Sequence, residues 1–318
     1  MTTLVLASNL GGGISRHLGL VATSVPIDVH ELSEDTSLLA KVRSARQLMR
    51  SSGPLPSRVV THGVAAAVAA RHRGRRLRAV EHVEHWHGDP FFLAPRRRLA
   101  YTTLARSGKA PALQVFTHEW LLPLYHDRRC RFEILPNTVP VQDVSAAPTT
   151  GTSRTAVFLG RLSPEKGVAD LLAAWPPDSE ARGWALDLWG SGPLGEVPAP
   201  PGVTFRGAPT DPMAVLARAD LVVIPSWTET GPYTACEAMA LGRPFVGTAT
   251  GDMPAFLTSG CGWSAPPRQP SGLRAALVEA QGASSDQLAD KGAAGRSWLA
   301  QNRPFEAWTR AVREIYGQ

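Results

Sequence analysis

Two glutamates, Glu229 and Glu237, stand where carboxylates could bind a hydroxyl-rich ligand. The apolar run Leu221–Ile224 before them is typical of a buried parallel strand. A loop carrying Glu229 follows, and a helix is expected from near Pro232 to Gly242, with Glu237 in its first turns. Ligands of open α/β sheets lie at the carboxyl ends of strands, where such loops are found. Both carboxylates can therefore serve one site and accept hydrogen bonds from sugar hydroxyls.

Two cations follow another predicted strand. This strand ends at Gly160 and Arg161, and the next helix starts after Lys166 and Gly167. Positive charge held at a strand end suits a diphosphate, because it stabilises the negative charge that a leaving diphosphate gains.

A glycine-rich loop connects the first strand, predicted over residues 3–8, to a helix that begins near Ile14. Gly11, Gly12 and Gly13 allow the backbone to approach a ligand closely. A helix N-terminus presents free N–H groups and the positive end of its dipole, which suits phosphate.

Three histidines, His82, His85 and His87, are closely spaced and suggest two interpretations. One is a metal site, although zinc sites usually have a fuller ligand set with supporting partners. The other is a strand that ends at His87-Gly88 and offers its last histidine to a ligand, with His85 as the second choice.

These stretches resemble the retaining GT-B glycosyltransferases of family 4, also called glycosyltransferase group 1. The resemblance rests on four patterns: two glutamates separated by seven residues in an Ala-x-Glu-Ala-Met-Ala-x-Gly-x-Pro context, Gly-Arg-Leu-x-x-x-Lys-Gly, Gly-Gly-x-x-Arg-His, and a strand ending in His-Gly. The chain departs from the family after Glu229, where Glu-Thr-Gly-Pro-Tyr replaces Glu-Gly-Phe-Gly, and at Thr138, which replaces a glycine.

The resemblance implies an α/β GT-B fold, with two Rossmann-like parallel-sheet domains that face each other across a cleft. Alternating strand and helix patterns support this class. We expect an acceptor-side domain at residues 1–141, to which a C-terminal helix at 303–318 returns. The donor-binding domain is expected at 142–302, after a segment of linker composition.

The implied reaction moves a hexose, with retention, from a nucleoside-diphosphate sugar to a hydroxyl of a glycan, glycolipid or natural-product acceptor. Such a step belongs to glycoconjugate or antibiotic biosynthesis. The implied catalytic residues are His87, Glu229, Arg161 and Lys166. The implied donor-binding residues are Gly12, Gly13, Asn137, Gly160, Arg206, Thr230, Gly231, Pro232, Tyr233 and Glu237. Arg16, His17 and Asp89 are expected on the acceptor side.

No cofactor is expected beyond the donor itself, which is UDP- or GDP-linked. The chain lacks an Asp-x-Asp motif, so we expect no metal requirement. Two alternatives stay open. A nucleotide-sugar epimerase of the same fold would convert the donor without an acceptor. A non-catalytic nucleotide- or glycan-binding protein would not need the combination of Glu229, Glu237, Arg161 and Lys166.

The net charge of +6 is concentrated in the first 150 residues, which hold 19 Lys and Arg against 11 Asp and Glu. Arg71–Arg78 and Arg96–Arg98 supply much of it. These clusters form either a solvated face or a peripheral contact with anionic membrane. Nucleic acid is not expected as a partner, because aromatic residues are not interleaved with the basic ones. The three cysteines are odd in number and lack metal-like spacing, and no apolar run is long enough for a membrane span, so we expect a cytoplasmic protein. Contact with the inner membrane face is one of the two alternatives for its basic clusters.

Overall fold

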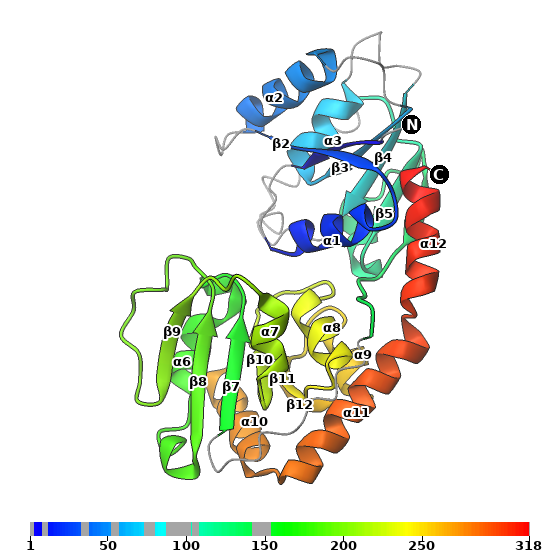
Figure 1. The fold of residues 1–318 in the computed structure, drawn as a ribbon. Coiled ribbons are helices and arrows are strands. Elements are labelled where there is room, and N and C mark those ends of the chain that lie inside the picture. Colours follow the sequence, from blue (N-terminus) through cyan, green and yellow to red (C-terminus); the bar gives the residue numbers. More distant parts are fainter. Residues whose placement is uncertain are drawn as a thin grey trace. The chain divides into compact units, whose positions relative to one another are not determined.

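The computed structural model describes residues 3–7, 12–32, 38–51, 57–72, 80–86, 103, 108–141 and 154–317. The chain forms two compact units (Figure 1). Unit 1 comprises Met1–Pro136 and Glu306–Gln318, and unit 2 comprises Asn137–Phe305. Each unit contains a six-stranded parallel sheet with helices, so the predicted α/β class with two Rossmann-like domains is confirmed. Among the described residues, no helix is both long and apolar enough to span a bilayer.

The sheet of unit 1 has the strand order β2-β1-β3-β4-β5-β6, and every pairing is parallel. Its strands are β1 (Thr3–Ala7), β2 (Ile27–Glu31), β3 (Arg58–His62), β4 (Glu81–Trp86), β5 (Leu113–Phe116) and β6 (Arg131–Ile134). Its described helices are α1 (Gly13–Ala22), α2 (Leu38–Ser51), α3 (Val64–Arg71), the short 3₁₀ helix η3 (Glu119–Leu121), α5 (Leu122–Tyr125) and α12 (Phe305–Tyr316). The last of these returns to unit 1 from the far end of the sequence.

Arg71, the first residue of the basic run Arg71–Arg78, is buried rather than solvated. Its guanidinium donates to both carboxylate oxygens of Glu84, at 2.5 and 2.7 Å, and to Asp127 Oδ2 at 2.6 Å. Gln114 Nε2 also donates to Glu84, at 2.8 Å. The Arg71 charge is therefore used inside unit 1. Residues 73–79 and 95–98 lie outside the described residues, so their predicted role at a surface stays a prediction.

The sheet of unit 2 has the strand order β12-β11-β10-β7-β8-β9, again wholly parallel. Its strands are β7 (Arg154–Leu159), β8 (Trp184–Trp189), β9 (Val203–Gly207), β10 (Leu221–Ile224), β11 (Phe245–Thr248) and β12 (Gly262–Ala265). Its helices are η4 (Pro164–Lys166), α6 (Val168–Ala174), η5 (Glu180–Arg182), α7 (Pro212–Ala217), α8 (Tyr233–Ala240), α9 (Met253–Leu257), α10 (Pro270–Gly282) and α11 (Ser285–Asn302). If β7 to β12 are renumbered 1 to 6, their order in the sheet is 6-5-4-1-2-3, which is the Rossmann order. In this order the chain reverses its direction across the sheet between β7 and β10.

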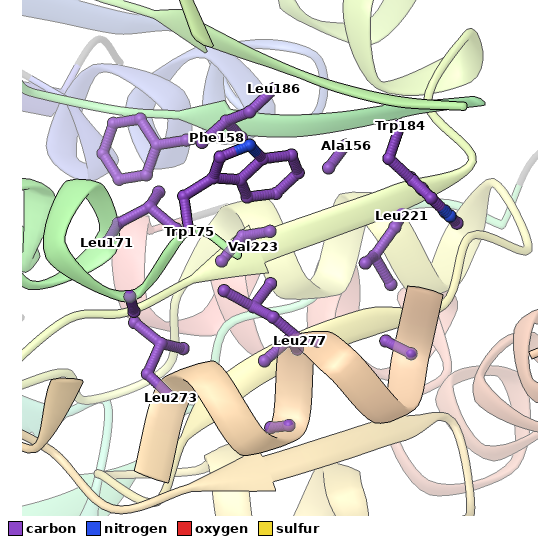
Figure 2. Close-up of a cluster of buried hydrophobic side chains, with 14 of the residues drawn as sticks. Ala156, Phe158, Leu171, Trp175, Trp184, Leu186, Leu221, Val223, Leu273 and Leu277 are labelled. Carbon is purple, nitrogen blue, oxygen red and sulfur yellow. The ribbon is translucent and has the colours of Figure 1, made fainter. Parts of the chain in front are cut away.

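Alternate residues of the central strands of unit 2 face opposite helical layers. Phe158 of β7 and Val223 of β10 lie in one apolar cluster with Trp175, which follows α6, and Leu277 of α10 (Figure 2). The intervening strand residues are buried on the other face. Burial of both faces explains why the sequence of these strands is a nearly continuous apolar run.

On that other face, α8 packs closely against α11 through glycine. A Cβ on Gly292 would lie 1.8 Å from the carbonyl oxygen of Gly242, which follows α8. A Cβ on Gly295 would lie 3.2 Å from Cγ of Met239 in α8. These contacts fix α8, the helix that carries Glu237, against the body of unit 2.

Candidate functional site

The candidate site of unit 2 lies at the carboxyl ends of β7 and β10, which are neighbours in the sheet. Lys166 follows β7, and Glu229 follows β10. Lys166 Nζ donates to Glu229 Oε1 at 2.6 Å, and the two side chains are 29% and 11% exposed. A cation and a carboxylate thus meet at the point where the strand order reverses, which is where Rossmann-like sheets bind their ligands.

Gly167 allows the two loops to approach each other. It has a φ of 71°, and a Cβ there would lie 1.9 Å from the carbonyl oxygen of Pro225. Two residues further into the second loop, the Trp227 amide donates to the Glu165 carbonyl at 2.9 Å. The backbones around Lys166 and Glu229 are therefore in direct contact, and the ion pair follows from that contact.

The side chain of Trp227 adds a further connection between these loops. Its indole N–H donates to Asp170 Oδ2 at 2.7 Å, in the first turn of α6. The guanidinium of Arg268 lies over the same ring, 4.8 Å from its centroid. Arg268 has a φ of 58°, the only positive φ among the described non-glycine residues.

Arg161 lies at the same edge of the sheet, immediately after Gly160. Its side chain is 52% exposed and lies 3.6 Å from Glu165, so its positive charge stays accessible to an anion. The turn after β8 folds over this segment, and a Cβ on Gly190 would lie 1.8 Å from the Gly160 carbonyl oxygen. The glycines after β7 and β8 therefore keep side-chain bulk away from the strand end.

The residues after Glu229 are held by backbone contacts. Asn137 Nδ2 donates to the Gly231 carbonyl at 2.7 Å, and the Asp252 amide donates to the Thr230 carbonyl at 2.8 Å. The amide group of Asn137 thus supports the loop, and its contact with the donor stays a prediction. Thr230 is buried, as is Tyr233 at the start of α8.

Glu237 lies in the second turn of α8 and is only 5% exposed. Pro232, with a φ of −66°, stands at the N-cap of this helix, one residue before its first helical residue, Tyr233. Arg206 lies at the other end of the site, on β9. It donates to Asp187 Oδ1 of β8 at 3.0 Å, and its side chain is 47% exposed.

In unit 1, Gly12 and Gly13 are exposed at the start of α1, and Arg16 is partly buried in its first turn. Gly12 is the N-cap of the helix and has a φ of 62°. A Cβ on Gly12 would meet no atom within 4 Å, so this glycine serves backbone conformation rather than close packing.

His17 is fully buried, and so are His62 and His85. All three imidazoles surround the hydroxyl of Tyr316 in α12, at 3.1 Å for His17 Nε2, 3.0 Å for His62 Nε2 and 3.3 Å for His85 Nδ1. His17 and His85, predicted for acceptor and donor contacts, thus contribute to the attachment of α12. His87 and Asp89 lie outside the described residues.

His82 lies on the opposite face of β4 from His85, because their spacing of three residues reverses the side-chain direction. His82 Nε2 lies 3.1 Å from Thr61 Oγ1, whereas His85 lies beside Tyr316. The two histidines therefore cannot ligate one ion. In the described part of the chain, no group of three His, Cys, Asp or Glu side chains is arranged for a metal.

The described thiols do not favour nucleophilic chemistry. Burial raises the pKa of Cys236 to about 12 and also raises that of Cys130 to about 12. The pKa of Cys261 is raised by burial as well. Only a thiolate is an effective nucleophile, so these cysteines stay protonated and unreactive near neutral pH.

Comparison with known proteins agrees with this assignment of the site to unit 2. Residues 153–281 match the family described as glycosyl transferases, group 1. None of the curated proteins matches the chain in sequence. The matched glycosyl transferase region contains Arg161, Lys166, Glu229 and Glu237, and it ends inside α10.

Solved structures resemble the whole chain. HepE of Anabaena, in complex with UDP-glucose, is 16% identical with a TM-score of 0.77, over 99% of this chain and 98% of its own. Sucrose-phosphate synthase of Thermosynechococcus elongatus is also 16% identical, with a TM-score of 0.75 and the same coverage. WaaG, a glycosyltransferase involved in lipopolysaccharide biosynthesis, is 16% identical with a TM-score of 0.73 over the full length of both chains. At these identities the comparison establishes the fold, which is GT-B.

Sequence reasoning assigned no role to three residues that shape the candidate site: Trp227, Asp252 and Arg303. Arg303 Nη1 donates to Asp252 Oδ2 at 2.7 Å, and both side chains are largely buried. The partners are far apart in sequence, so no local pattern announces the pair. The only sequence feature that points to Asp252 is its place beside Gly251 in a turn.

Proposed function

We propose that the chain is a glycosyltransferase that transfers a hexose from a nucleoside-diphosphate sugar to an acceptor hydroxyl. The observation that carries the proposal is the Lys166–Glu229 pair, at 2.6 Å, at the reversal point of the unit 2 sheet. A diphosphate sugar needs a cation beside its phosphates and a hydrogen-bond acceptor beside its hydroxyls. Lys166 and Glu229 supply these two groups next to each other.

UDP is our first choice of donor nucleotide, with GDP as the second, because UDP-glucose is the ligand of the HepE structure with the same fold. Glu229 would accept hydrogen bonds from the hexose hydroxyls. Glu237, one helical turn away from the loop, would accept them from the ribose. Arg206 would lie beside the base, and the glycines after β7 would let the phosphates approach the backbone.

Lys166 and Arg161 would accelerate the transfer through the leaving group. Negative charge accumulates on the diphosphate as the bond to the anomeric carbon breaks. Cations that are already in place bind this transition state more strongly than the ground state, which lowers the barrier. These two charges also support our proposal that the reaction needs no divalent ion.

We propose that the anomeric configuration is retained by a front-face route. The bond between the anomeric carbon and the diphosphate oxygen breaks, the acceptor oxygen bonds to that carbon from the same face, and the acceptor proton passes to the departing phosphate. Double displacement would instead require a carboxylate nucleophile beside the anomeric carbon. Glu229 is paired with Lys166, and Glu237 is buried in α8, so neither is assigned that role.

The acceptor class follows only from the resemblance: a glycan, a glycolipid or a natural product. His87 and Asp89, which lie outside the described residues, keep their proposed contacts with donor and acceptor. A peripheral contact of the basic first half with anionic membrane also stays a proposal. Co-sedimentation with vesicles of mixed neutral and anionic lipid, compared with neutral vesicles, tests it.

Calorimetric titration with UDP, GDP, ADP and dTDP, each with EDTA and with magnesium, tests the donor site. We expect one nucleotide to bind, with the same affinity in EDTA. Binding of none contradicts the proposal, and binding only with magnesium contradicts the metal-free part of it. Donor conversion in the absence of acceptor would identify an epimerase instead.

The variant K166M and its control K291M sharpen this test. Lys291 stacks on Trp263 at the other end of the sheet, 3.5 Å from the carbonyl oxygens of Gly260 and Gly262. We expect K166M to weaken nucleotide binding about 10- to 100-fold, the worth of a hydrogen bond to a charged group. K291M should bind as the wild type does, and equal losses in the two variants would contradict the role of Lys166.

A further inference from the structure

Arg303 occupies the C-cap of α11, where the chain is about to leave unit 2. Its side chain is 11% exposed. Besides the 2.7 Å bond to Asp252, Nη1 donates to the Asn137 carbonyl at 3.1 Å. The guanidinium also lies over the rings of Phe256 and Trp298, 4.9 and 5.7 Å from their centroids. The planar, permanently charged guanidinium of Arg303 is thus held by a carboxylate, a backbone carbonyl and two aromatic rings of unit 2.

Both partners of Arg303 contact the loop that carries Glu229. Asp252 donates its backbone amide to the Thr230 carbonyl, and a Cβ on Gly231 would lie only 2.6 Å from Asp252 Oδ2. Asn137 donates its side-chain amide to the Gly231 carbonyl. Two separate paths therefore connect Arg303 to the two residues that follow Glu229, one through Asp252 and one through Asn137.

We propose that Arg303 is a positioning residue that sets the place of the Glu229–Gly231 loop through Asp252 and Asn137, and so sets the affinity for the hexose part of the donor. This inference rests on the proposed function for its effect on the donor. Loss of the guanidinium removes the charged partner of a largely buried carboxylate and one partner of the Asn137 carbonyl. The Glu229–Gly231 loop then loses the guanidinium that fixes both Asp252 and Asn137, the two residues that support it.

Arg154 provides a matched control within unit 2. Like Arg303, it donates to a backbone carbonyl, that of Ala283 at 2.7 Å, and it also donates to Ser285 Oγ at 3.0 Å. It also lies over an aromatic ring, 5.5 Å from the centroid of Trp184. Arg154 begins β7 at the edge of the sheet opposite to the candidate site. R154M and R303M therefore both remove a guanidinium that donates to a backbone carbonyl and lies over an aromatic ring. R303M in addition removes the ion pair with Asp252, and so disturbs the supports of the loop.

Titration with UDP and with UDP-glucose separates the contributions of the nucleotide and of the hexose to donor affinity. For R303M we expect UDP-glucose affinity to fall about 10- to 100-fold, the penalty of a small displacement of an oriented group, while UDP affinity changes less than about threefold. R154M should change neither by more than about threefold. R303K, which keeps the charge but not the planar fork, should recover part of the loss. Equal effects of R303M and R154M on the two ligands would overturn the inference.

Hydrogen–deuterium exchange of the peptide 226–233 tests the same inference without any ligand. We expect R303M to exchange faster there than the wild type, and R154M to exchange at the wild-type rate. Unchanged exchange in R303M overturns the inference even if the wild type binds UDP-glucose. Faster exchange in a protein that binds no nucleotide would support the positioning of the loop while contradicting the proposed function.

Discussion

Gly167 holds a position that suits glycine alone, for two separate reasons. Its φ of 71° is left-handed, which costs other residues about 1–2 kcal/mol. Its missing side chain also makes room for the Pro225 carbonyl. We expect G167A to lower the free energy of unfolding of unit 2 by about 2–4 kcal/mol, since overpacking adds to the backbone strain. Urea denaturation measures this loss.

Gly207 is the matched control, because its φ is 73° and a Cβ there would meet no atom within 4 Å. G207A should lose only the left-handed strain, about 1 kcal/mol. If the two variants lost the same stability, the close approach of the loops at Gly167 would not be what holds Lys166 beside Glu229.

Single residues were predictable where chain direction and strand ends decide their place. Lys166 and Glu229 each follow an apolar run, so their arrival at one edge of the sheet follows from parallel strands. The burial of His17 was not predictable, because it depends on Tyr316, almost 300 residues later. The Arg303–Asp252 pair was hidden for the same reason.

At the scale of elements, α3, β4 and β5 of unit 1 are joined by a buried ionic cluster around Arg71. Burial alone would raise the pKa of Glu84, but the hydrogen bonds and charge of Arg71, with smaller contributions from His82 and Gln114, outweigh it and leave the pKa below its ordinary value. The pKa of Asp127 is also lowered, first by the hydrogen bond from Arg129 and also by that from Arg71. The folded state therefore favours both ionised carboxylates.

A carboxylate whose pKa is lowered on folding stabilises the protein above its unfolded pKa, and this contribution is lost as the pH falls through the folded pKa. We expect the stability of unit 1 to decline below about pH 4, the usual range of Glu and Asp. R71M should lower the free energy of unfolding at pH 7 by about 3–5 kcal/mol, because it breaks a buried pair. It should also lose less stability on acidification.

R129M serves as the comparison, since the Arg129 side chain is 46% exposed and pairs with the same Asp127. Its loss at pH 7 should be about 0–1 kcal/mol, as for surface pairs. Thermal melts of both variants from pH 3 to pH 7 test these values. A wild type that is as stable at pH 3 as at pH 7 would contradict the role of Glu84.

Most elements follow from local sequence, because apolar β-branched runs and glycine-ended helices repeat along the chain. The sheet order of unit 2 and the GT-B fold could be expected from the strand and helix alternation together with the family resemblance. The interior position of Arg71 could not, because an arginine in a basic run is indistinguishable by sequence from its solvated neighbours. Only the partners from β4 and the segment after α5 explain its burial.

At the scale of the whole molecule, α12 completes unit 1 from the far end of the chain. Arg58 Nη1 donates to the carbonyls of Glu314 and Ile315, at 2.6 and 2.5 Å, and Thr3 Oγ1 donates to that of Tyr316. The last turn of α12 is therefore capped by residues of β1 and β3, while the Tyr316 hydroxyl lies among the three histidines. We expect Y316F to destabilise unit 1 by about 1–3 kcal/mol, because buried polar groups lose a shared partner.

Alkaline pH offers a second measurement of this attachment. Burial raises the pKa of Tyr316 well above its ordinary value of 10. The unfolded chain therefore releases this proton first, so the stabilising effect of the neutral phenol is lost as the pH rises above about 10. Y316F should show a shallower decline between pH 9 and pH 11 than the wild type. Parallel declines would show that Tyr316 does not control the alkaline limit.

The division of unit 1 between the two ends of the sequence also orders events during synthesis. A ribosome makes all of Asn137–Phe305 before it makes Tyr316. Unit 2 is continuous in sequence and can fold as soon as it emerges, whereas the sheet of unit 1, made first, must wait for its final helix. During that interval the three histidines lack the Tyr316 hydroxyl, and His17 lacks its ring contact with Trp308. Unit 1, whose strands are translated before unit 2, is thus the last to be completed.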